Sequence, residues 1–428
     1  MKTELITVNS YLRELDVRVE WEEMKDEFEA LVEKYHSTYQ RKGFRKGKFP
    51  KALFKKEMVP SIEIEFSDKA VNDYFTKALN ECQLNPVNQA KIDHFHFHEN
   101  SELHFKATFE VIPEFKLPDY KNELKVTVNK LQKTEKDTAK TLESIQKQYA
   151  ETNTVDRPAI ESDLILADIE EVDENGTPIV GKKHENQLIS IDRGIFSEND
   201  HKLFIGKSAG DTINLSNDGA ENLVRFNIAI KEVKEQVLPE LNDEFAAKVR
   251  PNVKTFEELE QSIELELQQE LDRRFEHECR DRIADYFVKN TKVDIPSSMK
   301  EKYLDNIVED VKKKNPPTEQ IDETKVRESY AELAENVIRW QLVMDMLIDE
   351  EGLKVEREDL SKKFEALALQ FNMSAEKVKA MYSKSDKFSN LTEDIINDKL
   401  FGILKSFAKI KEVVVSTDDA NNANKKKK

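Results

Sequence analysis

Apolar and polar residues near the N-terminus follow two different periods. Leu15, Val17 and Val19 alternate with polar residues within LITVNSYLRELDVRVEW, and this period of two predicts a pair of β-strands. From Glu22 to Tyr39 the apolar side chains instead recur at every third or fourth position. That spacing places them on one face of a helix, so an amphipathic helix is predicted there.

The pattern then predicts a second helix and two closing strands. The helix is expected from Ser67, as its N-cap, to Cys82, with apolar residues again at helical spacing. The strands are expected over Lys91–Phe97 and Leu103–Ile112. These elements together predict that residues 1–113 form one α+β domain.

Short strands dominate the middle of the chain. The pattern over residues 114–152 predicts a linker. It consists of an extended arm that prolines interrupt and a short polar helix over Lys133–Ala150. Residues 153–238 predict a small β-rich domain with turns at Asn175-Gly176 and Asp218-Gly219. Its strands are expected over Leu164–Val172, Asn186–Ile191, Thr212–Leu215 and Leu223–Val233.

Residues 239–417 predict an almost wholly helical domain. Its helices are expected over Phe256–Asn290, Met299–Lys314, Val326–Glu350, Glu358–Phe371, Ala375–Ser383 with Ser374 as N-cap, and Leu391–Lys411. Their apolar stripes are thin and their charges many, which favours extended arms that expose scattered apolar residues. Residues 418–428 predict a disordered tail. The fold class is therefore α+β and multidomain.

Composition limits the function without defining it. The formal net charge of −18 favours solubility and works against general nucleic-acid binding. No apolar run reaches the ~18 residues that a membrane span needs, the first residues lack a signal-peptide core, and the two cysteines do not predict a disulfide framework. We therefore expect a cytoplasmic protein. No nucleophile triad, phosphate-binding loop, dinucleotide motif or metal-ligand spacing is present, so no cofactor is predicted.

One stretch departs from this acidic background. The segment 41–56, RKGFRKGKFPKALFKK, holds eight basic residues and no acid. Gly43 and Gly47 permit tight turns and Pro50 ends regular structure, which predicts an exposed loop that presents Phe44 between cations. Arginine and lysine bind phosphates, and an adjacent ring can enter a crevice in protein or RNA. A solvated loop without a partner is the alternative.

The segment GFRKGKFP resembles the ribosome-docking signature G-F-R-x-G-K-x-P of the trigger factor family, bacterial chaperones that meet nascent chains at the ribosomal tunnel exit. The residues that match are Gly43, Phe44, Arg45, Gly47, Lys48 and Pro50. The resemblance implies that Phe44, Arg45 and Lys46 contact a ribosomal protein and rRNA near the exit. Helical segments such as VDIPSSMKEKYLDNI resemble the C-terminal domain of the family in the family's order.

This family also carries an FKBP-type prolyl isomerase domain, and LFIGKSAGDTINL resembles its G-x-x-x-G-[DE] turn. Such enzymes lower the ~18–20 kcal/mol barrier to X-Pro rotation in a dry aromatic pocket. Here Ala167-Asp168-Ile169-Glu170 replaces the D-F-x-G motif of the family. The candidates left for a degenerate pocket are Phe196, Leu203, Phe204 and Phe226. We expect an FKBP-like fold with weak or absent activity, while retained activity stays open and no catalytic residue is assigned.

The resemblance implies a ribosome-associated, ATP-independent chaperone that binds nascent and unfolded polypeptides and delays their misfolding. Candidate client contacts on the helical arms are Met299, Tyr303, Met344 and Met346, because the methionine side chain adapts to varied partners. Ordinary helix–helix packing is the alternative for these residues. Two other functions stay open: an active prolyl isomerase, and a ribosome-docked assembly or scaffold factor. A homodimer off the ribosome also stays open.

Three histidines alternate with two phenylalanines in the predicted strand Lys91–Phe97 and just beyond it. On a regular strand, His94, His96 and His98 share one face, and Phe95 and Phe97 share the other. Such a row could bind zinc. A polar solvent face over an apolar core face is favoured, because acid or cysteine ligands are missing. We therefore predict no metal.

Overall fold

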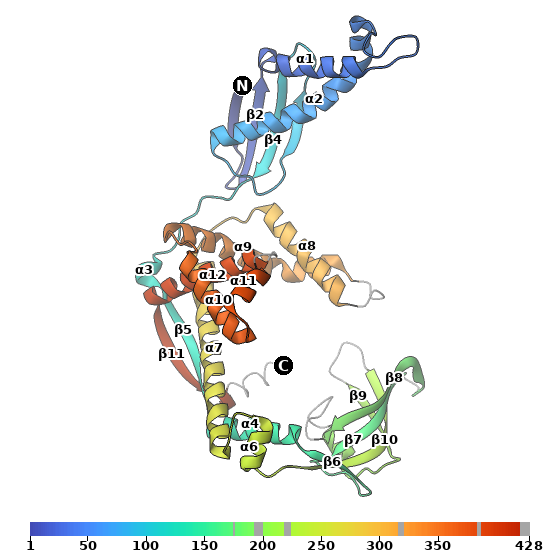
Figure 1. The fold of residues 1–428 in the computed structure, drawn as a ribbon, viewed down its shortest axis with the longest axis vertical. Helices are drawn as coiled ribbons and strands as arrows, with labels where there is room; N and C mark the ends of the chain where they lie inside the picture. The colour runs from blue at the N-terminus through green and yellow to red at the C-terminus, as the bar shows by residue number, and fades with distance from the viewer. Residues whose placement is uncertain (174–175, 192–199, 218–223, 316–320, 383–386, 420–428) are drawn as a thin grey trace. The chain divides into compact units, whose positions relative to one another are not determined.

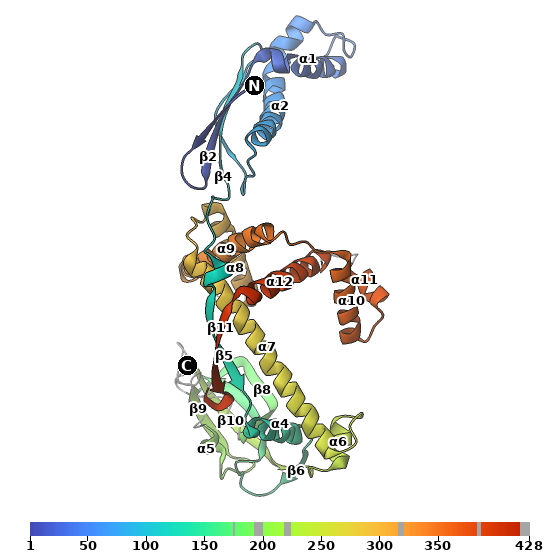
Figure 2. The ribbon, with the colours of Figure 1, turned by 90° about the vertical axis from the view of Figure 1, so that its left-hand side faces the viewer.

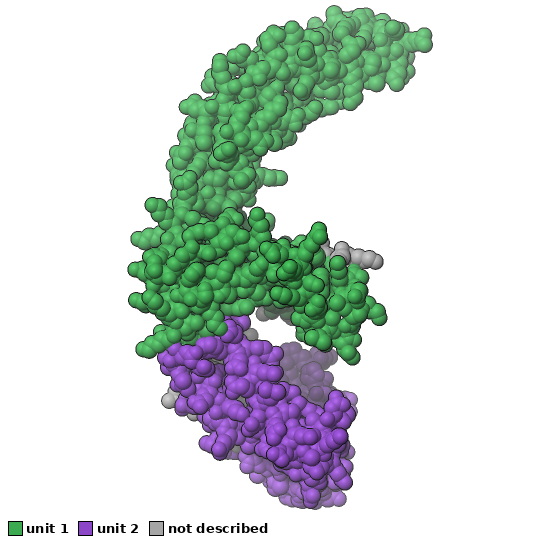
Figure 3. Space-filling model, turned by 60° about the vertical axis from the view of Figure 1, so that its left-hand side comes forward, with its two compact units in different colours: residues 1–128, 278–411 green, residues 129–277, 412–428 purple. Residues whose placement is uncertain are grey.

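The computed structural model describes residues 1–173, 176–191, 200–217, 224–315, 321–382 and 387–419. The chain divides into two compact units (Figure 3). Unit 1 comprises Met1–Val128 and Glu278–Lys411, and unit 2 comprises Asn129–His277 and Glu412–Lys428. Among the described residues, no helix combines the length and the hydrophobicity that crossing a membrane would need.

Unit 1 begins with a four-stranded antiparallel sheet in the order β1-β2-β4-β3. The strands are β1 (Lys2–Thr7), β2 (Leu12–Val19), β3 (Lys91–His96) and β4 (Leu103–Glu110). Two helices, α1 (Trp21–Thr38) and α2 (Lys51–Cys82), lie on one face of this sheet (Figures 1 and 2). The predicted alternation is confirmed, because Leu15, Val17 and Val19 are completely buried in the core beneath the helices.

The helix α2 is much longer than the sequence pattern predicts. It begins at Lys51, so the predicted N-cap role of Ser67 is wrong. Ser67 lies buried inside the helix, where its hydroxyl donates to the carbonyl oxygen of Ile64 (2.8 Å). Pro60 removes one backbone donor, but the buried residues Phe54 and Ile62 flank it and hold the turns together. Burial of one apolar face therefore outweighs the local break at proline.

Unit 2 contains a five-stranded antiparallel sheet in the order β6-β10-β7-β8, with β9 also pairing with β10. The strands are β6 (Glu151–Val155), β7 (Leu164–Val172), β8 (Pro178–Ser190), β9 (Thr212–Asn217) and β10 (Val224–Val237), and the short helix α5 (His201–Phe204) precedes β9. The four predicted strands correspond to β7, β8, β9 and β10, but β8 begins at Pro178, well before the predicted Asn186, and β6 was not predicted. The turn dipeptide Asp218-Gly219 and residue Asn175 lie outside the described residues.

The remaining chain is mostly helical, as predicted. The helices are α3 (Tyr120–Glu123), α4 (Glu135–Gln148), α6 (Asp243–Val249), α7 (Phe256–Asn290), α8 (Ser297–Lys314), α9 (Glu323–Glu350), α10 (Arg357–Phe371), α11 (Ala375–Tyr382) and α12 (Lys387–Phe407). The cap at Ser374 is confirmed, since its hydroxyl oxygen accepts from the backbone N–H of Lys377 (3.4 Å). The boundaries proposed for the domains stay predictions.

The C-terminal end differs from its prediction. The helix expected to reach Lys411 ends at Phe407, and β11 (Lys409–Ser416) follows and pairs with β5 (Lys125–Gln132). The run KIKEVVVS is rich in β-branched residues, which prefer strand geometry. The predicted disordered tail also begins too early, because Asp418 and Asp419 lie in a helical turn. The rest of that tail lies outside the described residues.

Candidate functional site

The basic loop connects α1 to α2 (Figure 1). Hydrogen bonds close its base. The backbone N–H of Gly47 donates to the carbonyl oxygen of Tyr39 (2.9 Å). Across the same base, Nε2 of His36 donates to the carbonyl oxygen of Phe49 (2.7 Å). Phe49 is buried, and its ring centroid lies 5.5 Å from that of Tyr39. The loop therefore leaves the domain from a fixed base.

Two glycines give the loop its path. Gly43 has φ +94° and Gly47 has φ +71°, a region that residues with side chains rarely adopt. A Cβ atom at Gly47 would lie 2.7 Å from the carbonyl oxygen of Ser37, whereas a Cβ atom at Gly43 would meet nothing within 4 Å. Of these two positions, only Gly47 lies so close to other backbone atoms that a side chain would clash.

The aromatic residue at the loop tip is exposed and supported from below. Phe44 is 45% exposed, although it is a large apolar side chain. Its ring stands edge-on against Phe49, with the centroids 5.0 Å apart and the planes at 87°. The structure therefore holds Phe44 in place while leaving much of its surface available to a partner.

Some of the loop's cations are used within the protein. They are Arg41, paired with Glu57; Lys51, paired with Glu33 (2.6 Å); and Lys55, paired with Glu99. The guanidinium of Arg41 holds the pKa of the Glu57 carboxyl below its usual value and also lies 5.4 Å from the ring centroid of Phe49. These pairs neutralise charge and tie the basic segment to α1, to α2 and to the turn that holds Glu99.

The other basic residues of the loop point outward without an acidic partner. Among the described residues, no ion pair or hydrogen bond joins a carboxylate to the exposed side chains of Lys42, Arg45, Lys46, Lys48 and Lys56. Each therefore keeps its full charge available for an external anion. The exposed ring of Phe44 lies among them in the chain, so the loop presents the combination of ring and cations that its sequence predicts.

The histidine row does not have the predicted geometry. A β-bulge shifts the pairing between Asp93 and His96, and His94 takes a positive φ of 52°. Phe95 is 48% exposed although it was predicted to face the core, and only Phe97 is buried. Across the described ranges, no three His, Cys, Asp or Glu residues lie close enough together to hold a metal ion.

The residues proposed for the isomerase pocket fall in different environments. Phe204 is buried in the core of the β-rich domain, and Phe226 packs against the same core. Leu203 is 46% exposed, and Phe196 lies outside the described residues. Asp168, which occupies the aromatic position of the family motif, instead pairs with Lys231 (2.7 Å). The structure thus shows an ion pair where the motif would place a ring.

The candidate client contacts are all half-buried. Met299 and Tyr303 lie on α8, and Met344 and Met346 lie on α9. Several more exposed apolar residues of the helical part were not singled out from the sequence. Those on and beside α10, α11 and α12 are Leu369 (85% exposed), Phe371 (51%), Met373 (40%), Met381 (55%) and Phe388 (38%), and Leu265 (60%) on α7 and Leu333 (48%) on α9 are exposed as well. Exposure depends on which neighbouring elements cover a side chain, and the pattern along the chain does not show that.

Comparison with known proteins places these features in a family. Residues 1–145 match the model of the bacterial trigger factor protein, and residues 255–406 match that of its C-terminus. The trigger factor of Chlorobium phaeobacteroides is 27% identical over 420 residues, covering 96% of this chain and 98% of the relative. The Bacillus cytotoxicus trigger factor is 28% identical over 404 residues, covering 89% and 93%.

A solved trigger factor chaperone, whose title describes promiscuous substrate recognition in folding and assembly, has a similar fold. It superposes with a TM-score of 0.53 at 19% identity, covering 94% of this chain and 99% of that chain. The fold is that of a multidomain α+β protein that carries an exposed basic loop. The chain belongs to the bacterial trigger factor family, because the two family models match more than two thirds of its residues. Family membership implies binding to the ribosome and to nascent chains.

The two loop glycines provide a matched test of the loop base. Gly47→Ala should cost about 1–2 kcal/mol for the left-handed backbone and a further amount for the clash with Ser37. Gly43→Ala carries only the backbone cost. We expect amide hydrogen exchange across 36–50, measured by mass spectrometry, to accelerate at least about tenfold more in Gly47→Ala. Equal exchange in both variants would contradict a close approach at Gly47.

Proposed function

We propose that this chain is a ribosome-associated, ATP-independent chaperone of the cytoplasm. It binds nascent and unfolded polypeptides at the tunnel exit and delays their misfolding. The proposal rests on one observation at the tip of the basic loop. There an aromatic ring that is 45% exposed lies beside cations without a partner among the described residues. Such a combination suits a mixed surface of RNA and protein, because the cations bind phosphates and the ring adds an apolar contact.

In this proposal the loop docks by two kinds of contact. Arg45 and Lys46 contact rRNA phosphates and a ribosomal protein, which gives affinity that falls with salt. Phe44 adds a short-range apolar anchor, and the turns around Gly47 and Pro50 present it. The net charge of the whole chain is −18, so the rest of the protein is repelled by RNA. Docking is therefore confined to this loop.

Client chains bind to the helical arms. We propose that Met299, Tyr303, Met344 and Met346 contribute through adaptable, half-buried side chains. The exposed residues on α10, α11 and α12 supply the larger part of the apolar surface. Many weak contacts over a large surface bind varied sequences without selecting one. Off the ribosome the same surfaces are free to contact a second copy, and we propose a homodimer as the free form.

The β-rich domain contributes little or no isomerase activity in this proposal. A pocket that weakens amide resonance must be apolar and dry. The pair between Asp168 and Lys231 puts charge where the family carries an aromatic ring. The ring of Phe204 packs in the core of the domain and does not line an open pocket. An active isomerase and a ribosome-docked scaffold factor are the competing functions, and the experiments below separate them.

Ribosome binding is tested by co-sedimentation of Phe44→Ala/Arg45→Ala/Lys46→Ala at two salt concentrations. We expect the wild type to bind, to weaken as salt rises, and to lose binding in the variant. The matched control Lys377→Ala/Lys387→Ala/Phe388→Ala removes the same residue classes elsewhere and should bind normally. Normal binding by the loop variant would leave the loop a solvated turn.

Client binding is tested by aggregation of an unfolded model protein. Leu369→Ser/Met373→Ser/Met381→Ser should weaken client affinity by about tenfold, because each serine removes exposed apolar surface. Ribosome binding should not change. Ile179→Ser/Val180→Ser/Leu188→Ser removes equally exposed apolar residues from β8 and serves as the control. If the wild type binds ribosomes yet never suppresses aggregation, the scaffold function is favoured.

Isomerase activity is tested with a short proline peptide. We expect the full chain to accelerate cis–trans isomerisation by less than about tenfold, a barrier reduction of under about 1.4 kcal/mol. An FKBP-type enzyme run alongside gives the reference rate. Acceleration of about 1,000-fold or more would show that a working pocket exists despite the pair at Asp168, and would favour the isomerase function.

A further inference from the structure

The strands β5 and β11 form a separate two-stranded sheet, and they are anchored very differently. Within β5, Val126 is 6% exposed and Val128 is completely buried. No residue of β11 is buried, and Val414 is 61% exposed. The strand β5 is therefore held by the core, whereas β11 lies at the surface. A sheet of only two strands is marginal in water unless other contacts support it.

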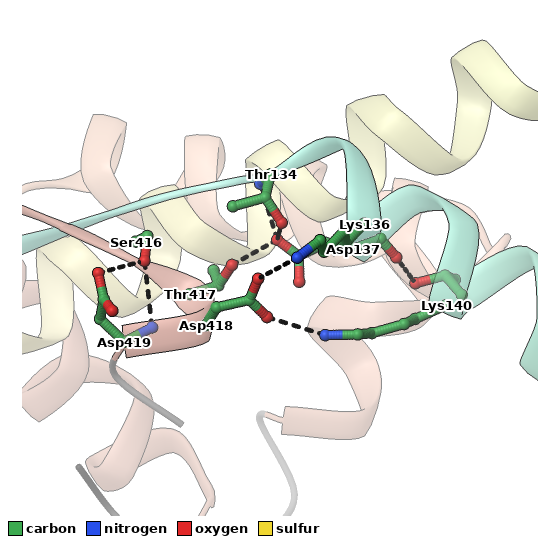
Figure 4. Close-up of polar contacts among 9 residues, drawn as sticks. Thr134, Lys136, Asp137, Lys140, Ser416, Thr417, Asp418 and Asp419 are labelled. Atoms are coloured by element: carbon green, nitrogen blue, oxygen red, sulfur yellow. Dashed lines mark hydrogen bonds and ion pairs between the residues drawn. The ribbon is translucent and has the colours of Figure 1, made fainter. Parts of the chain in front are cut away.

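Polar contacts at the end of the chain supply that support (Figure 4). The carboxylate of Asp137 accepts from the backbone N–H (2.8 Å) and the hydroxyl (2.9 Å) of Thr134, and also from the hydroxyl of Thr417. Asp418 pairs with Lys140 (2.9 Å) and lies 4.0 Å from Lys136. All of these residues belong to unit 2, so the turn after β11 is fastened to the start of α4.

One further ion pair lies along the strands themselves. Lys130 of β5 pairs with Glu412 of β11 (2.9 Å). Lys130, Lys136 and Lys140 together line the path of the C-terminal segment with positive charge, and its acids Glu412 and Asp418 match them. Their side chains are substantially exposed, so each pair contributes little and weakens with salt. The segment 409–419 is thus held by many small contacts.

Release of β11 would have a definite consequence for β5. The backbone N–H and C=O groups that now pair with β11 would lose their partners while β5 stayed in place. An edge of this kind accepts another extended chain by strand addition. Backbone bonds give such pairing its affinity whatever the side chains, which suits a surface that must accept varied sequences.

We propose that the edge of β5 is a binding site for an extended segment of a client polypeptide, and that β11 occupies this site in the unliganded protein. The preferred segment resembles β11 itself, with β-branched residues followed by acids that meet Lys130 and Lys140. The nature of this occupant rests on the proposed chaperone function, but the site does not. Because β11 is tethered, its effective concentration is high and only a competing strand displaces it.

The site is tested in the full chain with a labelled peptide that copies residues 409–419, KIKEVVVSTDD. Glu412→Lys/Asp418→Lys places the chain's own segment against Lys130 and Lys140, which should open the edge of β5. Fluorescence anisotropy should then show the peptide binding at least about tenfold more tightly than to the wild type. Glu376→Lys/Glu393→Lys makes the same charge change at exposed acids elsewhere and should bind as the wild type does.

A charge exchange gives the second test. Lys130→Glu/Lys140→Glu should prefer a peptide in which the residues copying Glu412 and Asp418 are lysine, by about tenfold over the original peptide. The proposal would be overturned if the wild type and Glu412→Lys/Asp418→Lys bound the peptide equally well. It would also be overturned if Lys130→Glu/Lys140→Glu did not come to prefer the lysine-containing peptide. Neither measurement involves ribosomes or folding clients. If the proposed chaperone function were wrong, ribosome co-sedimentation and suppression of aggregation would fail, while the peptide would still bind at β5.

Discussion

The segment from Tyr120 to Asp137 holds together parts of the chain that are far apart in sequence. Tyr120 is 3% exposed, its ring lies 5.7 Å from that of Phe287, and its hydroxyl donates to Glu350 (3.2 Å). Farther along, β5 pairs with β11. The helices have thin apolar stripes and cannot bury enough surface alone. Near Tyr120, α7 and α9 pack against this segment, whereas α10, α11 and α12 pack around a separate cluster that includes Phe364 and Leu391.

The basic loop follows a similar division between fixed and free parts. Its ends are fixed by Phe49, by the bond between Gly47 and Tyr39, and by ion pairs such as that of Arg41 with Glu57. Its tip keeps an exposed ring and cations that have no acidic partner in the described part of the chain. In the proposed docking, a fixed base lowers the entropy lost on binding, because the contact residues need little further ordering.

Uninterrupted elements could be predicted from the sequence, and local irregularities could not. The bounds of α7 and β7 agree with prediction, because neither segment contains a glycine or a proline. The pattern predicts α2 only from Ser67, whereas burial of residues such as Phe54 extends the helix back to Lys51. The exposure of Phe95 was missed because a β-bulge reverses the alternation, and a bulge depends on the partner strand.

Residue types along the chain were enough to predict the chemistry of the basic loop, since eight cations, two glycines and Phe44 lie within one short segment. Local residue types set that outcome. Only the tertiary structure decided which cations remain available, because Glu33, Glu57 and Glu99 come from separate elements. It also decided that β11 pairs with β5, about 280 residues away. Such pairing depends on which edges and charges the fold brings together, and periodicity along one segment carries no information about its distant partner.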